Sequence, residues 1–218
     1  MNGGANGFFK ILRFLQREPH PTLLNVLDVF MVNAEMFTVT EMVDSYIERL
    51  FMKGLKAPPS ELRIASWSWQ LADGMAYLHS HGIAHRNISP KTAWLTPNLE
   101  VKLGSFSLAT LFWDVKHNKK VMIKKNHKGS LEGHPPEEEG SFDPAAADVY
   151  MWGATVHFMV TKSLPTKRGG VDTSQPGIAA LSEDGRRILE MTMNPDPRHR
   201  PQAPAVLLNP WFRHFLQL

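Results

Sequence analysis

The sequence HRNISPKTAWL at residues 85–95 is followed closely by KLGSFSLA at residues 102–109. Within these two stretches, the apolar segments 93–95 and 101–103 lie on either side of the pair Pro97-Asn98. Short apolar segments separated by turn-forming residues predict two short strands joined by a turn. We therefore expect the chain to be organised around this hairpin and the polar loops beside it.

Long helices are predicted on both sides of this hairpin. Residues 61–80 carry apolar side chains around nearly the whole helix, which indicates burial, and Ser60 is a suitable N-cap. Residues 145–161 form the most apolar helix candidate and are expected at the centre of the fold. Closer to the C-terminus, Ser182 is expected to cap a helix over 183–193.

The first part of the chain predicts one helix and two strands. Residues 8–18 place apolar side chains on a broad helical face, and Pro19 ends this segment because proline lacks the backbone N–H. Residues 22–31 and 36–43 are short, apolar and rich in β-branched side chains, which predicts two strands. Residues 1–7 contain glycines but no flanking strand, and are expected to form a flexible tail.

Two further segments predict irregular structure. Residues 110–141 contain six lysines between positions 116 and 128 and an acidic run at 137–139. The lysine run fits a solvated loop better than a docking site for an acidic partner, a lipid or RNA. Residues 166–180 are rich in Gly, Thr, Ser and Pro and are expected to form a loop.

The composition limits the functional classes. The chain has 218 residues, 43% of them hydrophobic, and 24 basic against 21 acidic residues give a net charge of +3. This charge is too small to predict a nucleic-acid partner, and the absence of cysteine excludes disulfides and thiolate metal sites. No apolar run of about 18 residues and no signal-peptide pattern occur, so we expect no membrane partner and an intracellular, cytoplasmic location.

A series of short motifs runs along nearly the whole chain. They are HPTLL (20–24), TEMV (40–43), YLHSHGIAHR (77–86), PE (136–137), DVYMWG (148–153), PDPRHRP (195–201) and NPWF (209–212). Together with HRNISPKT, which is similar to H-R-D-L-K-x-x-N, and SFS, which is similar to D-F-G, they resemble a protein kinase over roughly residues 8–216. The sequence in and around these motifs most resembles that of Ser/Thr kinases of the calmodulin-dependent type.

The resemblance implies an α+β fold with a mostly helical C-lobe and an incomplete N-lobe, consisting of part of helix C and about two strands. It divides the chain into a tail at 1–7, a remnant of the N-lobe and hinge at 8–43, and a C-lobe at 44–218. The activation segment would cover about residues 104–137.

The positions that perform chemistry in kinases are changed. The resemblance places Asn87 where the family has its catalytic aspartate and Ser89 where it has a lysine that faces phosphate. Thr92 and Ser105 take the positions of the asparagine and aspartate that bind magnesium. A neutral amide cannot take up a proton, and magnesium prefers anionic oxygen. We therefore expect no catalytic residue and no metal site, and the histidines His79, His81 and His85 also predict no zinc site.

The positions that bind the nucleotide in kinases are only partly represented in this sequence. The resemblance makes Thr40 the gatekeeper and assigns Glu41 and Val43 to the hinge. No glycine-rich loop or strand-borne lysine is found ahead of helix C, so we expect neither ATP nor magnesium as a cofactor.

Several structural positions of the family are retained. The resemblance gives His85 and Phe106 a place in the hydrophobic spine, and makes Asp148 the residue that holds the catalytic-loop backbone. It further implies that Glu137 and Arg200 form a buried ion pair. Arg86 matches an arginine that can receive an activation-loop phosphate, for which Ser130 is a conceivable acceptor.

Three functions remain open at this point. The leading one is a pseudokinase that acts as a binding or allosteric module for a protein partner. The second is a weakly active Ser/Thr kinase that uses ATP and magnesium at a rearranged site. The third is a truncated kinase gene product without independent function.

Overall fold

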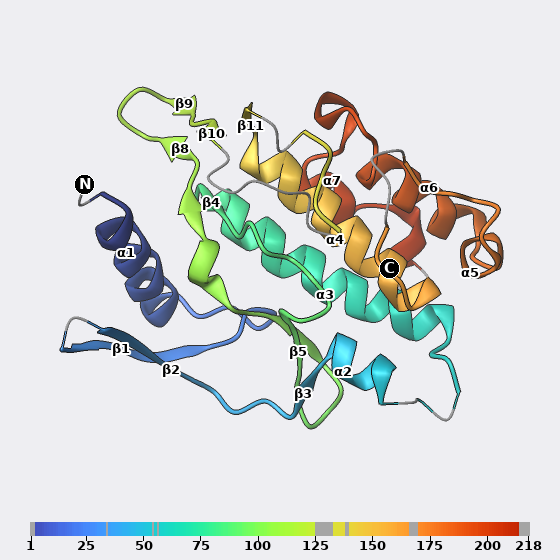
Figure 1. Cartoon of the computed structure of the whole chain (residues 1–218), viewed down its shortest axis with the longest axis horizontal. Coiled ribbons are helices and arrows are strands. Elements are labelled where there is room, and N and C mark those ends of the chain that lie inside the picture. Colours follow the sequence, from blue (N-terminus) through green and yellow to red (C-terminus); the bar gives the residue numbers. More distant parts are fainter. Residues whose placement is uncertain are drawn as a thin grey trace.

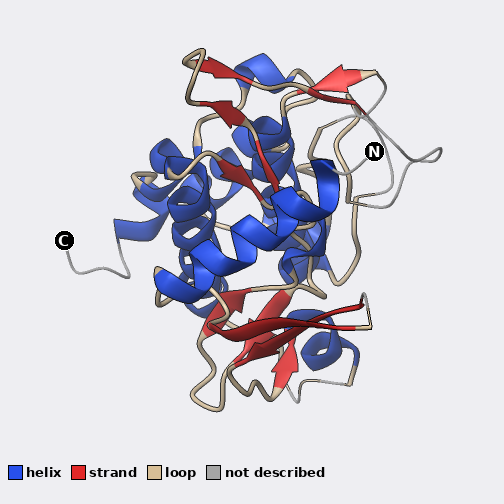
Figure 2. Cartoon of the chain, turned by 90° about the vertical axis from the view of Figure 1, so that its left-hand side faces the viewer, coloured by secondary structure: helices blue, strands red, loops and turns tan. Residues whose placement is uncertain are grey.

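The computed structural model describes residues 3–33, 35–53, 55, 57–124, 133–137, 140–165 and 170–213, with side chains from residue 7 onward. Most of these residues belong to a helical body, and strands gather at two of its ends (Figure 2). The strands near the N-terminal helix lie at one end, and the short strands of residues 113–142 lie at the other (Figure 1). The predicted α+β class is confirmed.

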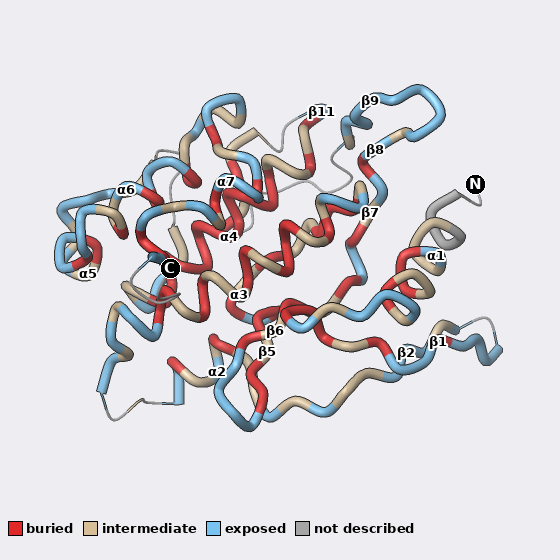
Figure 3. Tube along the Cα trace, turned by 180° about the vertical axis from the view of Figure 1, so that it is seen from behind, coloured by how far each residue is buried: buried red, intermediate tan, exposed pale blue. Residues whose placement is uncertain are grey.

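Two long helices, α3 (Glu61–Ser80) and α4 (Pro144–Thr161), lie side by side through the centre of the molecule (Figure 1). Ser60 caps α3 by accepting a hydrogen bond from the backbone N–H of Arg63, which confirms the predicted start. The indole of Trp152 on α4, which is fully buried, donates to the carbonyl of Ser68 on α3 at 2.9 Å. Both helices are buried over most of their length (Figure 3).

Smaller helices cover α4 and the start of α3. They are α5 (Pro176–Ala179), α6 (Glu183–Thr192), η2 (Pro197–His199), α7 (Ala203–Leu207) and η3 (Pro210–Phe212). Ser182 caps α6 as predicted, by accepting from the N–H of Gly185. The short helix α5 lies inside the segment expected to be a loop, and residues 166–169 of that segment lie outside the described residues.

The N-terminal part consists of α1 (Gly3–Arg17) and the antiparallel pair β1 (Val26–Val32) and β2 (Glu35–Thr40). Helix α1 packs against β1 through buried residues that include Ile11, Leu12 and Val29. The predicted tail at 1–7 is wrong for residues 3–7, because the helix begins at Gly3. Glycine disfavours a helix by about 1 kcal/mol relative to alanine, which is why the local sequence predicted no helix there.

The predicted central hairpin is confirmed as β5 (Ala93–Leu95) and β6 (Val101–Leu103), which are antiparallel and joined by β3 (Ser45–Tyr46) in one sheet. The helix α2 (Ile47–Met52) follows β3. Strand β4 (Ile83–Ala84) pairs with β7 (Thr110–Leu111), and η1 (Phe106–Leu108) lies between β6 and β7 in the chain.

The segment expected to be irregular contains further two-residue strands. These are β8 (Trp113–Asp114), β9 (Lys119–Lys120), β10 (Ile123–Lys124) and β11 (Ser141–Phe142). Residues 125–132, which include Ser130, and residues 138–139 lie outside the described part of the chain. Within the described part, no helix is both long enough and apolar enough to cross a membrane.

Candidate functional site

Asp148 holds the loop that begins at His85. Its fully buried carboxylate accepts hydrogen bonds from the backbone N–H groups of His85 at 2.7 Å and Arg86 at 2.6 Å. The Nε2 atom of His79 lies 2.9 Å from the same carboxylate. Arg86 has a φ of 63°, a conformation that non-glycine residues rarely adopt. The two bonds to Asp148 stabilise this strained turn, so the predicted structural role of Asp148 agrees with its contacts.

The imidazole of His85 joins the two polar loops. Its Nε2 lies 2.9 Å from the carbonyl of Gly104, and its Nδ1 accepts from the backbone N–H of Asn87 at 3.2 Å. A carbonyl only accepts and an N–H only donates, so this pair of contacts requires a neutral ring with the proton on Nε2. Burial lowers the pKa of His85, which favours the same neutral form. The ring also packs edge-on against Phe106, with centroids 5.5 Å apart.

The hydroxyl of Thr92 is used inside its own loop. It donates to the carbonyl of Asn87 at 2.7 Å and accepts from the backbone N–H of Ser89 at 3.0 Å. The residue is only 5% exposed. Thr92 therefore closes the loop from within, and the side chains of Asn87 and Ser89 remain half-buried beside it.

Ser105 lies directly across from this loop. It adopts a left-handed conformation with φ 65° and ψ 61°, and its Oγ accepts from the indole N–H of Trp94 at 3.3 Å. The preceding Gly104 is tightly enclosed, since an added Cβ would lie 2.8 Å from both Leu24 and Trp94. The side chain of Ser105 is thus fixed against β5.

The four candidate positions lie on the two polar loops. Asn87, Ser89, Thr92 and Ser105 are all neutral, so none of them supplies an anionic ligand or a proton acceptor of carboxylate strength. Among the described residues, no group of three or more His, Asp or Glu side chains is arranged to hold a metal ion. These four side chains can therefore donate and accept hydrogen bonds.

Of the three residues expected to form the hinge, Glu41 is bonded to the β5–β6 sheet. Thr40 pairs with Val26 at the end of β2. The carboxylate of Glu41 binds Nζ of Lys102 on β6 at 2.7 and 2.9 Å and accepts from the backbone N–H of Asn25 at 2.7 Å. Val43 is half-buried. Lys102 was not among the residues predicted from the sequence. A lysine between the two apolar residues of a short strand could have indicated a buried or half-buried ion pair.

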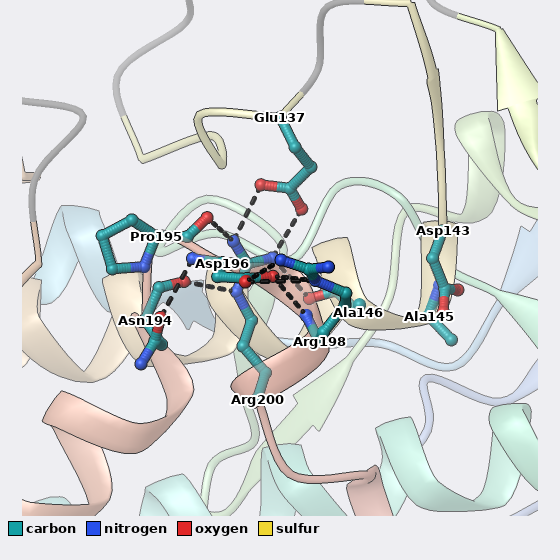
Figure 4. A network of polar contacts seen from close by, with 9 residues as sticks. All are labelled: Glu137, Asp143, Ala145, Ala146, Asn194, Pro195, Asp196, Arg198 and Arg200. Atoms are coloured by element: carbon teal, nitrogen blue, oxygen red, sulfur yellow. Dashed lines mark hydrogen bonds and ion pairs between the residues drawn. The ribbon is translucent and has the colours of Figure 1, made fainter.

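The predicted pair of Glu137 and Arg200 is present and buried. The side chain of Arg200 is fully enclosed, and its two terminal nitrogens donate to the two carboxylate oxygens of Glu137 (Figure 4). The same guanidinium donates to the carbonyls of Asn194 at 2.7 Å and Ala146 at 3.0 Å, and lies 4.9 Å from the ring centre of Tyr150. These contacts join residues before α4, the start of α4 and the loop after α6.

Arg86 is less completely bonded. Among the described residues, its Nη1 makes one long hydrogen bond to the carbonyl of Leu108 at 3.4 Å, and its buried Nε has no partner. The side chain therefore has unused hydrogen-bonding capacity.

The match to known proteins extends over nearly the same residues as the motifs. The family model described as protein kinase domain matches residues 8–212. The chain is 23% identical over 202 residues to CBL-interacting serine/threonine-protein kinase 5 of Arabidopsis thaliana, covering 89% of this chain and 45% of that protein. It is 26% identical over 211 residues to calcium-dependent protein kinase 6 of Plasmodium berghei, covering 90% of this chain and 14% of that protein.

A third relative is the serine/threonine-protein kinase PLK4 of Aedes aegypti, which is 24% identical over 220 residues, covering 97% of this chain and 28% of that protein. The chain thus spans less than half the length of these curated relatives. The matched range includes the two polar loops, Asp148 and the Glu137–Arg200 pair.

Proposed function

We propose that this member of the protein kinase superfamily is catalytically inactive and acts as a protein-binding or allosteric module. The chain belongs to that superfamily and is similar to its calmodulin-dependent Ser/Thr branch. One observation carries this proposal. The positions for the base and for both metal ligands hold Asn87, Thr92 and Ser105. A cytoplasmic location suits the cysteine-free composition, and the partner is a protein rather than nucleic acid or a membrane.

The geometry supports the loss of catalysis at each position. Phosphoryl transfer requires a group that orients the attacking hydroxyl and anionic ligands that hold magnesium against the phosphates. Replacing the proton acceptor by the Asn87 amide removes a contribution of about 10²–10⁴ in rate. The hydroxyl oxygens of Thr92 and Ser105 already have hydrogen-bond partners in the protein, and neither carries the negative charge that compensates for stripping water from magnesium.

The parts of the site that maintain shape are intact. Asp148 holds the backbone of the His85 loop, and Arg200 holds Glu137. Both contacts join segments that are distant in sequence, so they preserve the relative positions of α3, α4 and the activation segment. A domain that retains this framework still offers a defined surface to a partner.

Residual phosphoryl transfer is the competing function, because the curated relatives are named as protein kinases. It would require ATP and magnesium to bind without a carboxylate at positions 87 and 105. Lys91, two residues after Ser89, does not replace the phosphate-facing lysine of the family, since its exposed ammonium lies 3.6 Å from Glu48.

Thermal unfolding with ATP and magnesium separates the two functions. We expect the same melting temperature with and without magnesium–ATP. The combined variant Asn87→Asp, Thr92→Asn and Ser105→Asp serves as a comparison, because it restores the three family side chains. A magnesium-dependent stabilisation of the unaltered chain, together with phosphate transfer that disappears in Asn87→Ala, contradicts the proposal.

A further inference from the structure

Helix α1 presents two chemically different faces. Its inner face carries the buried residues Ile11, Leu12 and Leu15. Residues 9, 10, 13, 14 and 17 lie within an arc of about 140° on the opposite side, because successive residues of an α-helix are about 100° apart. This outer face combines two aromatic side chains, Phe9 and Phe14, with three cations.

The outer face of α1 forms one wall of a groove. The groove has a volume of about 570 Å³ and is lined by residues of α1 and by His81, which follows α3. Its lining residues are Phe9, Lys10, Arg13, Phe14, Arg17, Glu18 and His81. Phe14 packs against His81 with ring centroids 4.8 Å apart, and His81 packs against Tyr77 at 4.5 Å. Aromatic rings therefore give the groove an apolar surface where Phe14 lies against the end of α3.

The charges of this groove are almost all of one sign. Lys10 and Arg17 are exposed, and neither makes an ion pair with another described residue. Arg13 lies over the ring of Phe9 at 5.2 Å, and its nearest carboxylate is that of the exposed Asp28 at 3.8 Å. Glu18 is the single acidic residue of the lining. Lys102 and Arg200 differ from these cations, since they are paired with half-buried carboxylates.

We infer that this groove binds an acidic peptide segment of a partner protein, one that places an apolar or aromatic side chain against Phe14 and His81. Its carboxylates meet Lys10, Arg13 and Arg17, and its apolar side chain removes the half-buried ring of Phe14 from water. A peptide fits better than nucleic acid because the cations form one short stripe beside a concave apolar surface. Nucleic-acid surfaces instead spread many cations along a phosphate backbone. This inference names the partner chemistry for the proposed binding function and rests on it.

The test uses the full chain and a displayed library of random twelve-residue peptides. We expect the selected peptides to combine Asp or Glu with Phe, Trp or Leu. We also expect their affinity to fall at least tenfold in the double variant Lys10→Glu, Arg17→Glu. The matched control is Arg187→Glu, Arg213→Glu, which makes the same charge change at exposed positions far from the groove and should leave the affinity unchanged. Equal unfolding midpoints of the two double variants show that both are folded.

Several results overturn the inference. They are the absence of any selected peptide, selected peptides that are neutral or basic, and affinity that survives Lys10→Glu, Arg17→Glu. Equally tight binding of a twelve-nucleotide single-stranded RNA that is lost in the same variant also overturns it, because the face is then a general anion surface. Stabilisation by magnesium–ATP contradicts the inactive-kinase proposal alone, since no groove residue belongs to the polar loops.

Discussion

Arg200 holds Glu137 through two parallel hydrogen bonds, from Nη1 to Oε1 and from Nη2 to Oε2 at 2.7 Å, with the arginine side chain fully enclosed. Such a pair contributes geometric specificity because both planar groups must align. Removing one partner is costly, because the other charge stays buried without its counterion.

We expect Glu137→Ala to lower the free energy of unfolding by about 3 kcal/mol. The loss is not larger because Arg200 keeps its bonds to the carbonyls of Asn194 and Ala146. Urea unfolding measures the change. The control is Arg198→Gln, two residues from Arg200, which breaks an exposed pair with Asp196 and should have a much smaller effect. Equal losses in the two variants would show that the Glu137 pair is not structural.

We expect the stability to fall as the pH decreases below about 6.5, in part because of His85. Burial lowers its pKa in the folded chain, so below about 6.5 the unfolded chain binds a proton that the folded chain does not. Protonation would also remove the acceptor at Nδ1 that binds the N–H of Asn87. The contribution of His85 is therefore complete above its ordinary pKa and decreases below it.

The variant His85→Gln isolates this effect. The pKa of His20 is also lowered by burial, but that contribution is present in both proteins and cancels in the comparison. We expect the unaltered chain to have a steeper pH dependence than the variant, by up to about 1.4 kcal/mol per pH unit. A slope unaffected by His85→Gln refutes the assignment of a neutral ring.

We expect Asp148→Asn to destabilise the chain by about 3 kcal/mol. The carboxylate has two accepting oxygens for three donors, whereas an asparagine offers one oxygen and turns an NH₂ group toward a buried N–H. Urea unfolding and amide exchange at His85 and Arg86 report the change. Glu190→Gln, at an exposed position on α6, is the control, and an effect of Asp148→Asn no larger than that of the control contradicts this role.

Two glycine-to-alanine substitutions should change the free energy of unfolding in opposite directions. Alanine normally stabilises a helix relative to glycine by about 1 kcal/mol, and Gly7 on α1 has open space around the position of a Cβ. We expect Gly7→Ala to stabilise the chain by up to about 1 kcal/mol. At Gly153 on α4, a Cβ would lie 2.6 Å from Oγ1 of Thr192 and 2.7 Å from Cγ of Met193. Gly153→Ala should therefore destabilise by about 1–3 kcal/mol, as calorimetry can measure, and stabilisation by it would contradict the close packing of α4 and α6.

The sequence determined much of the fold through local rules. Ser60 and Ser182 capped the predicted helices, and the turn at Pro97-Asn98 joined the predicted strands. The motif order identified the family and placed Asn87 and Ser105 in the candidate site, because side-chain chemistry at an aligned position is read directly from the sequence. The start of α1 at Gly3 was missed, since helix propensity alone disfavours glycine there.

The tertiary structure alone decided which groups meet. Lys102 reaches Glu41 across 61 residues of sequence, and the indole of Trp94 fixes Ser105. The groove between α1 and His81 likewise exists only because Phe14 on α1 lies against Tyr77 and His81 at the end of α3. Short-range patterns specify the backbone state of each segment, whereas the pairing of charges and the shape of a groove depend on how those segments pack. The sequence thus placed Thr92 and Ser105 on two polar loops, and the packing showed that their hydroxyls form hydrogen bonds within the protein itself.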